Sequence, residues 1–140
     1  MRTIHPSPLL RGVLIADAVV SGAAALLQLG AAGWLSALLA LPRELLVETG
    51  AFLVVYAAML VVIARSPGVW SVLIAIIVSG NVAWAVACVG LLLASTLAPS
   101  GLGVAFILLQ TVAVLVFAAL EYAGLRGSAP SARAGAAVVR

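Results

Sequence analysis

Hydrophobic residues fill four long stretches of the chain, which are separated by short groups of arginine, proline and glycine. The stretches cover residues 9–41, 45–64, 69–97 and 102–125. Each is long enough for the roughly 20-residue helix that crosses the hydrocarbon core of a bilayer. Proline and glycine end helices, and they occur at the breaks, for example in Pro67-Gly68. The pattern predicts an all-α fold, a four-helix transmembrane bundle running up-down-up-down, in a single domain over residues 1–126.

The composition excludes a soluble domain. Hydrophobic residues make up 66% of the chain and charged residues 8%, whereas a soluble protein has roughly 25% charged residues. No charged residue occurs between Val69 and Leu120. A small soluble domain leaves about a third of its surface in water, and this chain has too few polar residues to cover that surface. We therefore expect the chain to lie in a lipid bilayer.

The arginines predict the orientation of the four helices. With four spans, both termini and the loop after the second span lie on one side, and the other side carries Arg43 together with Glu44 and Glu48. The arginines of the first side are Arg2, Arg11, Arg65, Arg126, Arg133 and Arg140. Arginine is enriched in cytoplasmic loops, so we expect both termini in the cytoplasm. The absence of lysine and the abundance of alanine, leucine and valine favour a bacterial protein, whose location would be the inner membrane. Residues 127–140 are expected to form a disordered cytoplasmic tail.

Several kinds of function are excluded by residues that the chain does not contain. The net charge is +3, but the arginines are scattered and form no basic patch with aromatic residues, so we expect no nucleic-acid partner. Cys88 and His5 are the only cysteine and the only histidine. The chain therefore has no haem-ligating histidine pair and no cysteine-based metal site. No motif of a nucleophile and its base occurs either, and we expect no enzyme activity, no cofactor and no metal.

Polar residues inside the predicted spans are the candidate functional residues, because polar groups in lipid are costly and usually face a bundle interior. Asp17 and Gln28 lie on one face of the first helix, and Gln110 and Glu121 have the same spacing in the fourth. Because these helices run in opposite directions, we expect the two acids at one depth and the two glutamines at another. Counting residues from the helix ends predicts the depth of two further side chains. Tyr56 is expected at the depth of the acids, and Asn81 at the depth of the glutamines.

Two interpretations of these residues remain open. The amides can be structural hydrogen-bonding groups between helices, and the acids can pair with Arg11 and Arg126 near the membrane surface. Alternatively, Asp17 and Glu121 form a proton-binding site. The small residues are also expected to lie at helix contacts, where they allow close approach. In the first and third spans they are Ala18, Gly22, Ala25, Gly80, Ala83 and Ala87.

Two kinds of similarity bear on the architecture. Val20-Ser21-Gly22 recurs as Val78-Ser79-Gly80, and Ala51-Phe52-Leu53 resembles Ala105-Phe106-Ile107. These offsets are compatible with two helical hairpins duplicated in parallel.

Short motifs in residues 1–65 show the second similarity. They are LRGVLIADA at residues 10–18, Ser21-Gly22, Leu41-Pro42, and Leu45-Leu46 ahead of Gly50. The chain thus has an arginine before the first helix, a polar residue just inside it and then a Leu-Pro turn. This layout resembles small four-helix bacterial integral membrane proteins of the DoxX-like group. The resemblance implies an inner-membrane helical bundle associated with redox or stress proteins, and it supplies no catalytic residues.

Two functions are compatible with these features. The first is a non-enzymatic accessory or interaction subunit, which packs against itself as a homo-oligomer or against another membrane protein. The second is a small proton-coupled transporter that works as a homo-oligomer. In that case Asp17 and Glu121 exchange protons, while Gln28, Asn81 and Gln110 contact the cargo.

Overall fold

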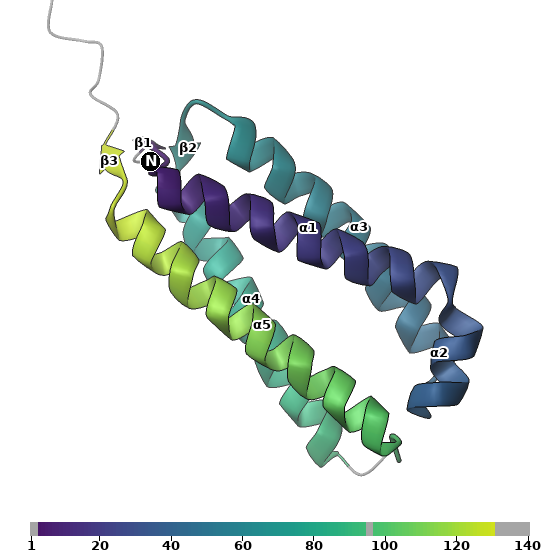
Figure 1. Cartoon of the computed structure of the whole chain (residues 1–140). Helices are drawn as coiled ribbons and strands as arrows, with labels where there is room; N and C mark the ends of the chain where they lie inside the picture. The colour runs from purple at the N-terminus through teal and green to yellow at the C-terminus, as the bar shows by residue number, and fades with distance from the viewer. Residues whose placement is uncertain (1–2, 95–96, 131–140) are drawn as a thin grey trace, which may run out of the picture.

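The computed structural model describes residues 3–94 and 97–130, most of which are helical (Figure 1). The helices are α1 (Pro8–Gly30), α2 (Ala32–Leu39), α3 (Arg43–Arg65), α4 (Ser71–Leu93) and α5 (Gly101–Arg126). Three short strands are β1 (Thr3–His5), β2 (Val69–Trp70) and β3 (Ala129–Pro130). The strands lie at one end of the bundle, which we call the sheet end, and α2 lies at the opposite end, which we call the α2 end.

The helices α1, α3, α4 and α5 are each long and apolar enough to cross a membrane. They fall within the four stretches predicted from the sequence, to within a few residues at the ends. The predicted all-α fold with four transmembrane helices is therefore confirmed, and the chain is a multi-pass membrane protein.

The first predicted stretch, residues 9–41, is not one helix. The backbone leaves helical geometry at Ala31 (φ −124°, ψ 23°), and α2 follows as a separate helix of 8 residues. Ala40 then ends α2 in the left-handed conformation (φ 52°). An unbroken helix over the whole stretch, at 1.5 Å per residue, would exceed the roughly 30 Å hydrocarbon core of a bilayer. The break confines the spanning part to α1.

The four spanning helices form two antiparallel hairpins (Figure 1). The most extensive contacts join α1 with α3 and α4 with α5, and the main contact between the hairpins joins α1 with α5. Contacts between α3 and α4 are sparse. This arrangement contains the hairpins that the repeat hypothesis requires, while their origin by duplication stays a prediction.

The sheet end ties together three segments that are distant in the sequence. The strand order is β2-β1-β3, with both pairings antiparallel, so Ile4 pairs with Val69 on one side and with Pro130 on the other. These strands were not predicted. Residues 127–140 were expected to be disordered, but Ala129 and Pro130 pair with β1, because β1 offers them a free edge. The remainder of that predicted tail, residues 131–140, lies outside the described residues.

A second tie joins the hairpins at the α2 end. Ser100 caps the start of α5 by accepting a hydrogen bond from the Gly103 amide (3.1 Å). It also donates from its own amide to the Leu39 carbonyl (3.0 Å) and from its hydroxyl to the Leu38 carbonyl (2.8 Å). The two hairpins are thus fastened to each other at both ends of the bundle.

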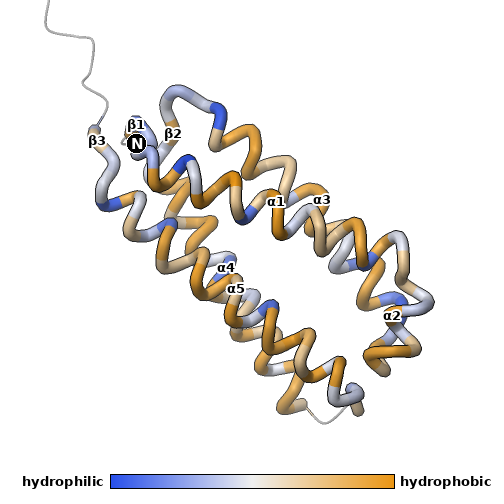
Figure 2. The backbone as a smooth tube through the Cα atoms, viewed as in Figure 1, coloured by the Kyte–Doolittle hydropathy of each residue, from blue (hydrophilic) through white to orange (hydrophobic). Residues whose placement is uncertain are grey.

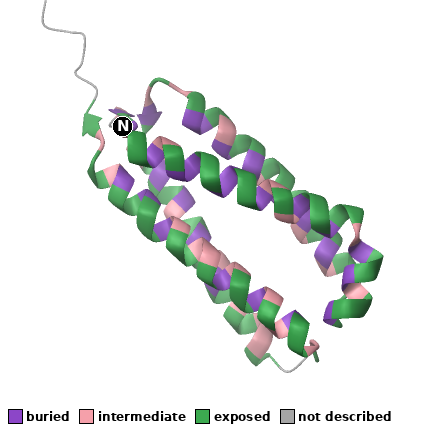
Figure 3. Cartoon of the chain, viewed as in Figure 1, coloured by how far each residue is buried: buried purple, intermediate pink, exposed green. Residues whose placement is uncertain are grey.

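Many apolar side chains are exposed on the outside of this bundle, and several polar side chains of the spans are buried (Figures 2 and 3). Leu26 on α1 is 73% exposed, whereas Asp17 and Gln28 on the same helix are each 1% exposed. On α5, Leu109 is 69% exposed, whereas Glu121 is fully buried. Apolar side chains therefore both pack inside the bundle, as Leu14 and Leu60 do, and cover its outside, where they suit lipid. The buried polar side chains of the spans lie inside.

Candidate functional site

Asp17 is at the centre of a buried hydrogen-bond cluster. The Ser21 hydroxyl, one turn further along α1, donates to its Oδ1 atom (2.9 Å). The Tyr56 hydroxyl of α3 and the Asn81 amide of α4 both donate to Oδ2, at 2.9 and 3.3 Å. Three of the four spanning helices thus supply hydrogen bonds to one carboxyl group.

Asn81 links this carboxyl group to a second one. Its Nδ2 atom also donates to Oε2 of Glu121 on α5 at 3.1 Å. An amide nitrogen carries two hydrogens, so Asn81 can serve both acids at once. The Tyr56 hydroxyl lies 3.1 Å from Asn81 Oδ1. Because a hydroxyl has one proton, Tyr56 donates either to Asp17 or to Asn81. We call Asp17, Tyr56, Asn81 and Glu121 the acid cluster.

The acid cluster is surrounded by neutral groups. Arg11 donates to the Ser66 carbonyl at 3.1 Å, and the Arg126 guanidinium lies 5.9 Å from the centre of the Tyr122 ring. The contacts that the structure gives to the two acids come from hydroxyl and amide groups. The expected pairing of the acids with Arg11 and Arg126 is therefore not the arrangement in the structure. Oε1 of Glu121 is buried and has no hydrogen-bond partner among the described residues.

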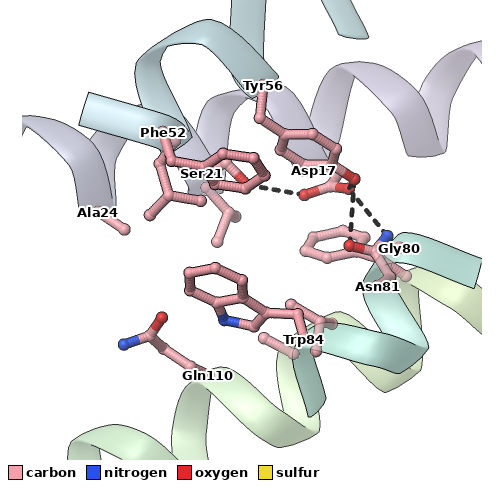
Figure 4. Close-up of a pocket in the computed structure, with 14 residues that line it drawn as sticks. Asp17, Ser21, Ala24, Phe52, Tyr56, Gly80, Asn81, Trp84 and Gln110 are labelled. Carbon is pink, nitrogen blue, oxygen red and sulfur yellow. Dashed lines mark hydrogen bonds between the residues drawn. The ribbon is translucent and has the colours of Figure 1, made fainter. Parts of the chain in front are cut away.

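A cavity of about 110 Å³ adjoins the acid cluster and is lined by all four spanning helices (Figure 4). Asp17, Tyr56 and Asn81 contribute to its wall, whereas Glu121 does not. The rest of the wall is mostly apolar and includes Phe52, Trp84 and Phe117. The polar groups of the cluster therefore border one part of a largely apolar chamber.

Three aromatic rings extend along this wall. Phe52 stacks on Tyr56, with ring centres 6.1 Å apart, and on Trp84, with ring centres 5.6 Å apart and the planes 7° from parallel. Phe52 belongs to α3 and Trp84 to α4 (Figure 4). The stacked pair joins the two helices whose mutual contacts are sparse.

The two glutamines do not share a site. Gln28 is buried at the contact between α1 and α3, where its Oε1 accepts a hydrogen bond from Thr49 (2.5 Å), and its Nε2 has no partner in the part of the chain that the structure describes. Gln110 instead lines the cavity (Figure 4). Gln28 is thus a contact between helices, and Gln110 is the glutamine that could touch a bound molecule.

Asn81 lies with the acids and not with the glutamines. The prediction that grouped it with the glutamines is wrong. Asn81 lies 10 residues after the start of α4 and Asp17 lies 9 residues after the start of α1, whereas Gln28 lies 20 residues after the start of α1. Asn81 and Asp17 are therefore at similar distances from the sheet end. The sequence also gave no role to Phe52, although its spacing of four residues from Tyr56 places the two rings on one helix face.

Among the described residues, no three histidine, cysteine or acidic side chains come together as a group that could hold a metal ion. Comparison with protein-family models, with curated proteins and with solved structures finds no match for this chain. The DoxX-like resemblance therefore stays a prediction. The fold and the site define a multi-pass membrane protein with two buried carboxyl groups beside a partly open cavity.

Proposed function

We propose that the protein is a small proton-coupled transporter of the bacterial inner membrane, with both termini in the cytoplasm. The observation that carries the proposal is the linkage of Asp17 on one hairpin to Glu121 on the other through Asn81, directly beside the cavity. The orientation is supported by Arg11, Arg65 and Arg126, which all lie toward the sheet end.

The reason for proton binding is the cost of two charges in one apolar site. Like charges a few ångströms apart repel strongly where water is absent, and a carboxyl pair lowers this cost by sharing one proton. The acid cluster contains no cationic partner for either acid among its members. One proton held between Asp17 and Glu121 removes one of the two charges.

The reason for transport is the position of this pair between two hairpins. Loss or gain of the proton changes the charge that α1 and α5 present to each other. Many transporters move one half of a bundle against the other around a central site. A cavity that is lined by both hairpins and touches the acid pair can therefore couple cargo binding to proton movement.

A transport assay tests the proposal. Proteoliposomes that contain the purified protein are given a pH gradient, and the uptake of a mixed panel of small amines, alcohols and carboxylic acids is measured by mass spectrometry. We expect at least one compound to accumulate against its gradient only while the pH gradient lasts. Glu121→Gln should reduce this accumulation to the level of protein-free liposomes, because glutamine cannot release a proton.

Glu48→Gln is the matched control, because Glu48 is exposed and lies outside the acid cluster. It should transport like the unmodified protein. If no compound responds to the pH gradient, or if Glu121→Gln transports normally, proton coupling through this pair is wrong.

An accessory or interaction subunit is the second candidate function. Small residues of α1 lie at contacts within the chain, since Ala18 and Ala25 are buried. On α4 the expected contacts are absent within the described residues. Gly80 lines the cavity, and Ala83 and Ala87 are exposed one turn apart. An exposed face of small residues favours close packing with another helix, either in a second copy or in another membrane protein.

Leucine at Ala83 should disrupt such packing, because its larger side chain keeps a second helix away. We expect Ala83→Leu to reduce the dimer fraction several-fold in native mass spectrometry from lipid nanodiscs. Val55→Leu is the control, since Val55 is 71% exposed, lies on α3 and is already a large apolar residue. An unmodified protein that is monomeric, or an unchanged dimer fraction in Ala83→Leu, would exclude this face as an interface between copies.

A further inference from the structure

We propose that the cavity binds a small organic ammonium ion, with Asp17 as its ion-pair partner, and that Glu121 holds the exchanged proton without touching the ligand. The exchange half of this inference rests on the proposed transport function, whereas the choice of ligand rests on the cavity alone. Charge, wall chemistry, size and the unequal positions of the two acids each support it.

The charge of the wall selects a cation. Asp17 is the only charged side chain among the described residues that line the cavity, and the other polar residues there are neutral. The neutral polar residues are Ser21, Tyr56, Asn81 and Gln110. An anion would meet a carboxylate in an apolar chamber, which is strongly unfavourable. An ammonium group can pair with Asp17 and donate a further hydrogen to the hydroxyl oxygen of Ser21.

The apolar wall selects an organic cation over a simple ion. Phe52, Trp84 and Phe117 provide aromatic surface, and Val20, Leu53 and Val114 provide aliphatic surface. A metal or alkali ion needs several oxygen ligands, and most of this wall offers none. Ring faces attract cations, and an apolar ligand group gains from leaving water. The wall therefore fits a molecule with one cationic end and one hydrocarbon end.

The volume limits the size of that molecule. The cavity measures about 110 Å³, and an engineered cavity of about 150 Å³ is known to hold benzene. This cavity is smaller but partly open, so a short branched alkyl group fits inside it, and a ligand with one small ring fits with part of the ring in the open side. Larger amines would require the hairpins to separate or the Phe52–Trp84 stack to open.

The two acids have different surroundings, and this separates their roles. Asp17 borders the cavity, whereas Glu121 is fully buried behind Asn81 and has one unpartnered oxygen, Oε1. The titratable groups facing this pair are Tyr56 from α3 and the two acids themselves, and the Arg11 and Arg126 side chains make their contacts elsewhere.

When an ammonium ion pairs with Asp17, the acid cluster gains one positive charge. Release of one proton from Glu121 restores the balance, so one cation enters for one proton that leaves.

The experiment compares three ligands that share one ring and differ in the charge of the head group. They are benzylammonium, benzyl alcohol and benzoate, titrated calorimetrically at pH 7 into the full chain in lipid nanodiscs. We expect the ammonium ion to bind about tenfold more tightly than the alcohol, as one charge-assisted contact predicts, and benzoate not to bind. Asp17→Asn should bring the ammonium ion and the alcohol to equal affinity. Equal affinities in the unmodified protein, or a preference that survives in Asp17→Asn, would overturn the ligand assignment.

The number of protons released on ligand binding distinguishes the role of Asp17 from that of Glu121. Titrations in two buffers with different ionisation enthalpies should show about one proton released for each ammonium ion bound. Glu121→Gln should keep the ammonium preference and lose the proton release, and Glu48→Gln should change neither. Loss of the preference in a folded Glu121→Gln protein would place Glu121 in the ligand site and contradict this division of roles.

The binding and transport assays fail independently. Selective ammonium binding without pH-driven uptake would reject the transport function and keep the ligand assignment. Uptake of a neutral or anionic compound, without ammonium binding, would keep the transport function and reject the assignment.

Discussion

Asn81→Leu is expected to lower the free energy of unfolding by about 3–5 kcal/mol. Leucine has a similar size but no hydrogen-bond donor, so Glu121 and Asp17 each lose the hydrogen bond that they accept from Asn81. The two carboxyl groups would then face each other without the amide between them. The loss can be measured by denaturant titration of the purified protein in mild detergent.

The neighbouring substitution Val82→Leu serves as the control, because Val82 is exposed and the substitution replaces one apolar side chain by another. It should change stability by no more than about 0.5 kcal/mol. The double variant Asn81→Leu/Glu121→Leu should recover at least half of the loss. Replacing a whole buried polar contact by apolar residues is often neutral, whereas breaking one side of it is not. A double variant that is less stable than Asn81→Leu would show that the Asn81–Glu121 contact is not the source of the loss.

Gly124→Ala is expected to cost about 1–3 kcal/mol, the usual cost of forcing an extra methyl group into a packed contact. At the sheet end α1 and α5 approach so closely that a Cβ atom on Gly124 would lie 2.9 Å from Cα and Cβ of Leu10. Main-chain atoms cannot move aside as a flexible side chain can, so the two helices must separate. We expect a lower melting temperature in the same detergent.

Gly12→Ala provides the comparison within the facing helix. A Cβ atom on Gly12 meets nothing within 4 Å, and alanine favours a helix over glycine by roughly 1 kcal/mol. This variant should melt at or above the temperature of the unmodified protein. If the Gly124→Ala and Gly12→Ala variants had the same melting temperature, the close contact of Gly124 with Leu10 would not contribute to stability as expected.

The spanning helices could be predicted because the membrane sets strict requirements on length and polarity. The uncharged stretch from Val69 to Leu120 can only be accommodated in lipid, and Pro99 and Gly101 divide it. The common depth of Asp17 and Glu121 could also be predicted, since residue spacing along two oppositely directed helices determines depth. The Asn81 amide that links them confirms that common depth.

The composition of the acid cluster could not be predicted, because it depends on how the helices are ordered around the bundle. Spacing along a helix does not determine which helices are neighbours. The contact of Asn81 with both acids requires α4 to face α1 and α5 at one level. The place of Phe52 in the cavity wall could not be predicted for a related reason. An apolar ring is equally compatible with a position that faces lipid.

The strands could not be predicted because their pattern is too short to detect. Thr3–His5 has three residues, and each partner strand has two. Hydrophobic alternation needs at least four residues to indicate a strand. These residues pair because the helix ends bring them together, with the Ser7 hydroxyl donating to the Gly124 carbonyl (3.0 Å) and the Ser7 amide donating to the Ser128 hydroxyl (3.0 Å).

The sheet also sets an order of assembly during synthesis. The strand β1 leaves the ribosome before its partners, which follow α3 and α5, so β1 stays unpaired while those helices are made and inserted. Pairing of β1 with β3 becomes possible only after α5 has been placed beside α1. Closure of the sheet is therefore a late step of biogenesis, and a nascent chain released before Ala129 would leave one edge of β1 exposed.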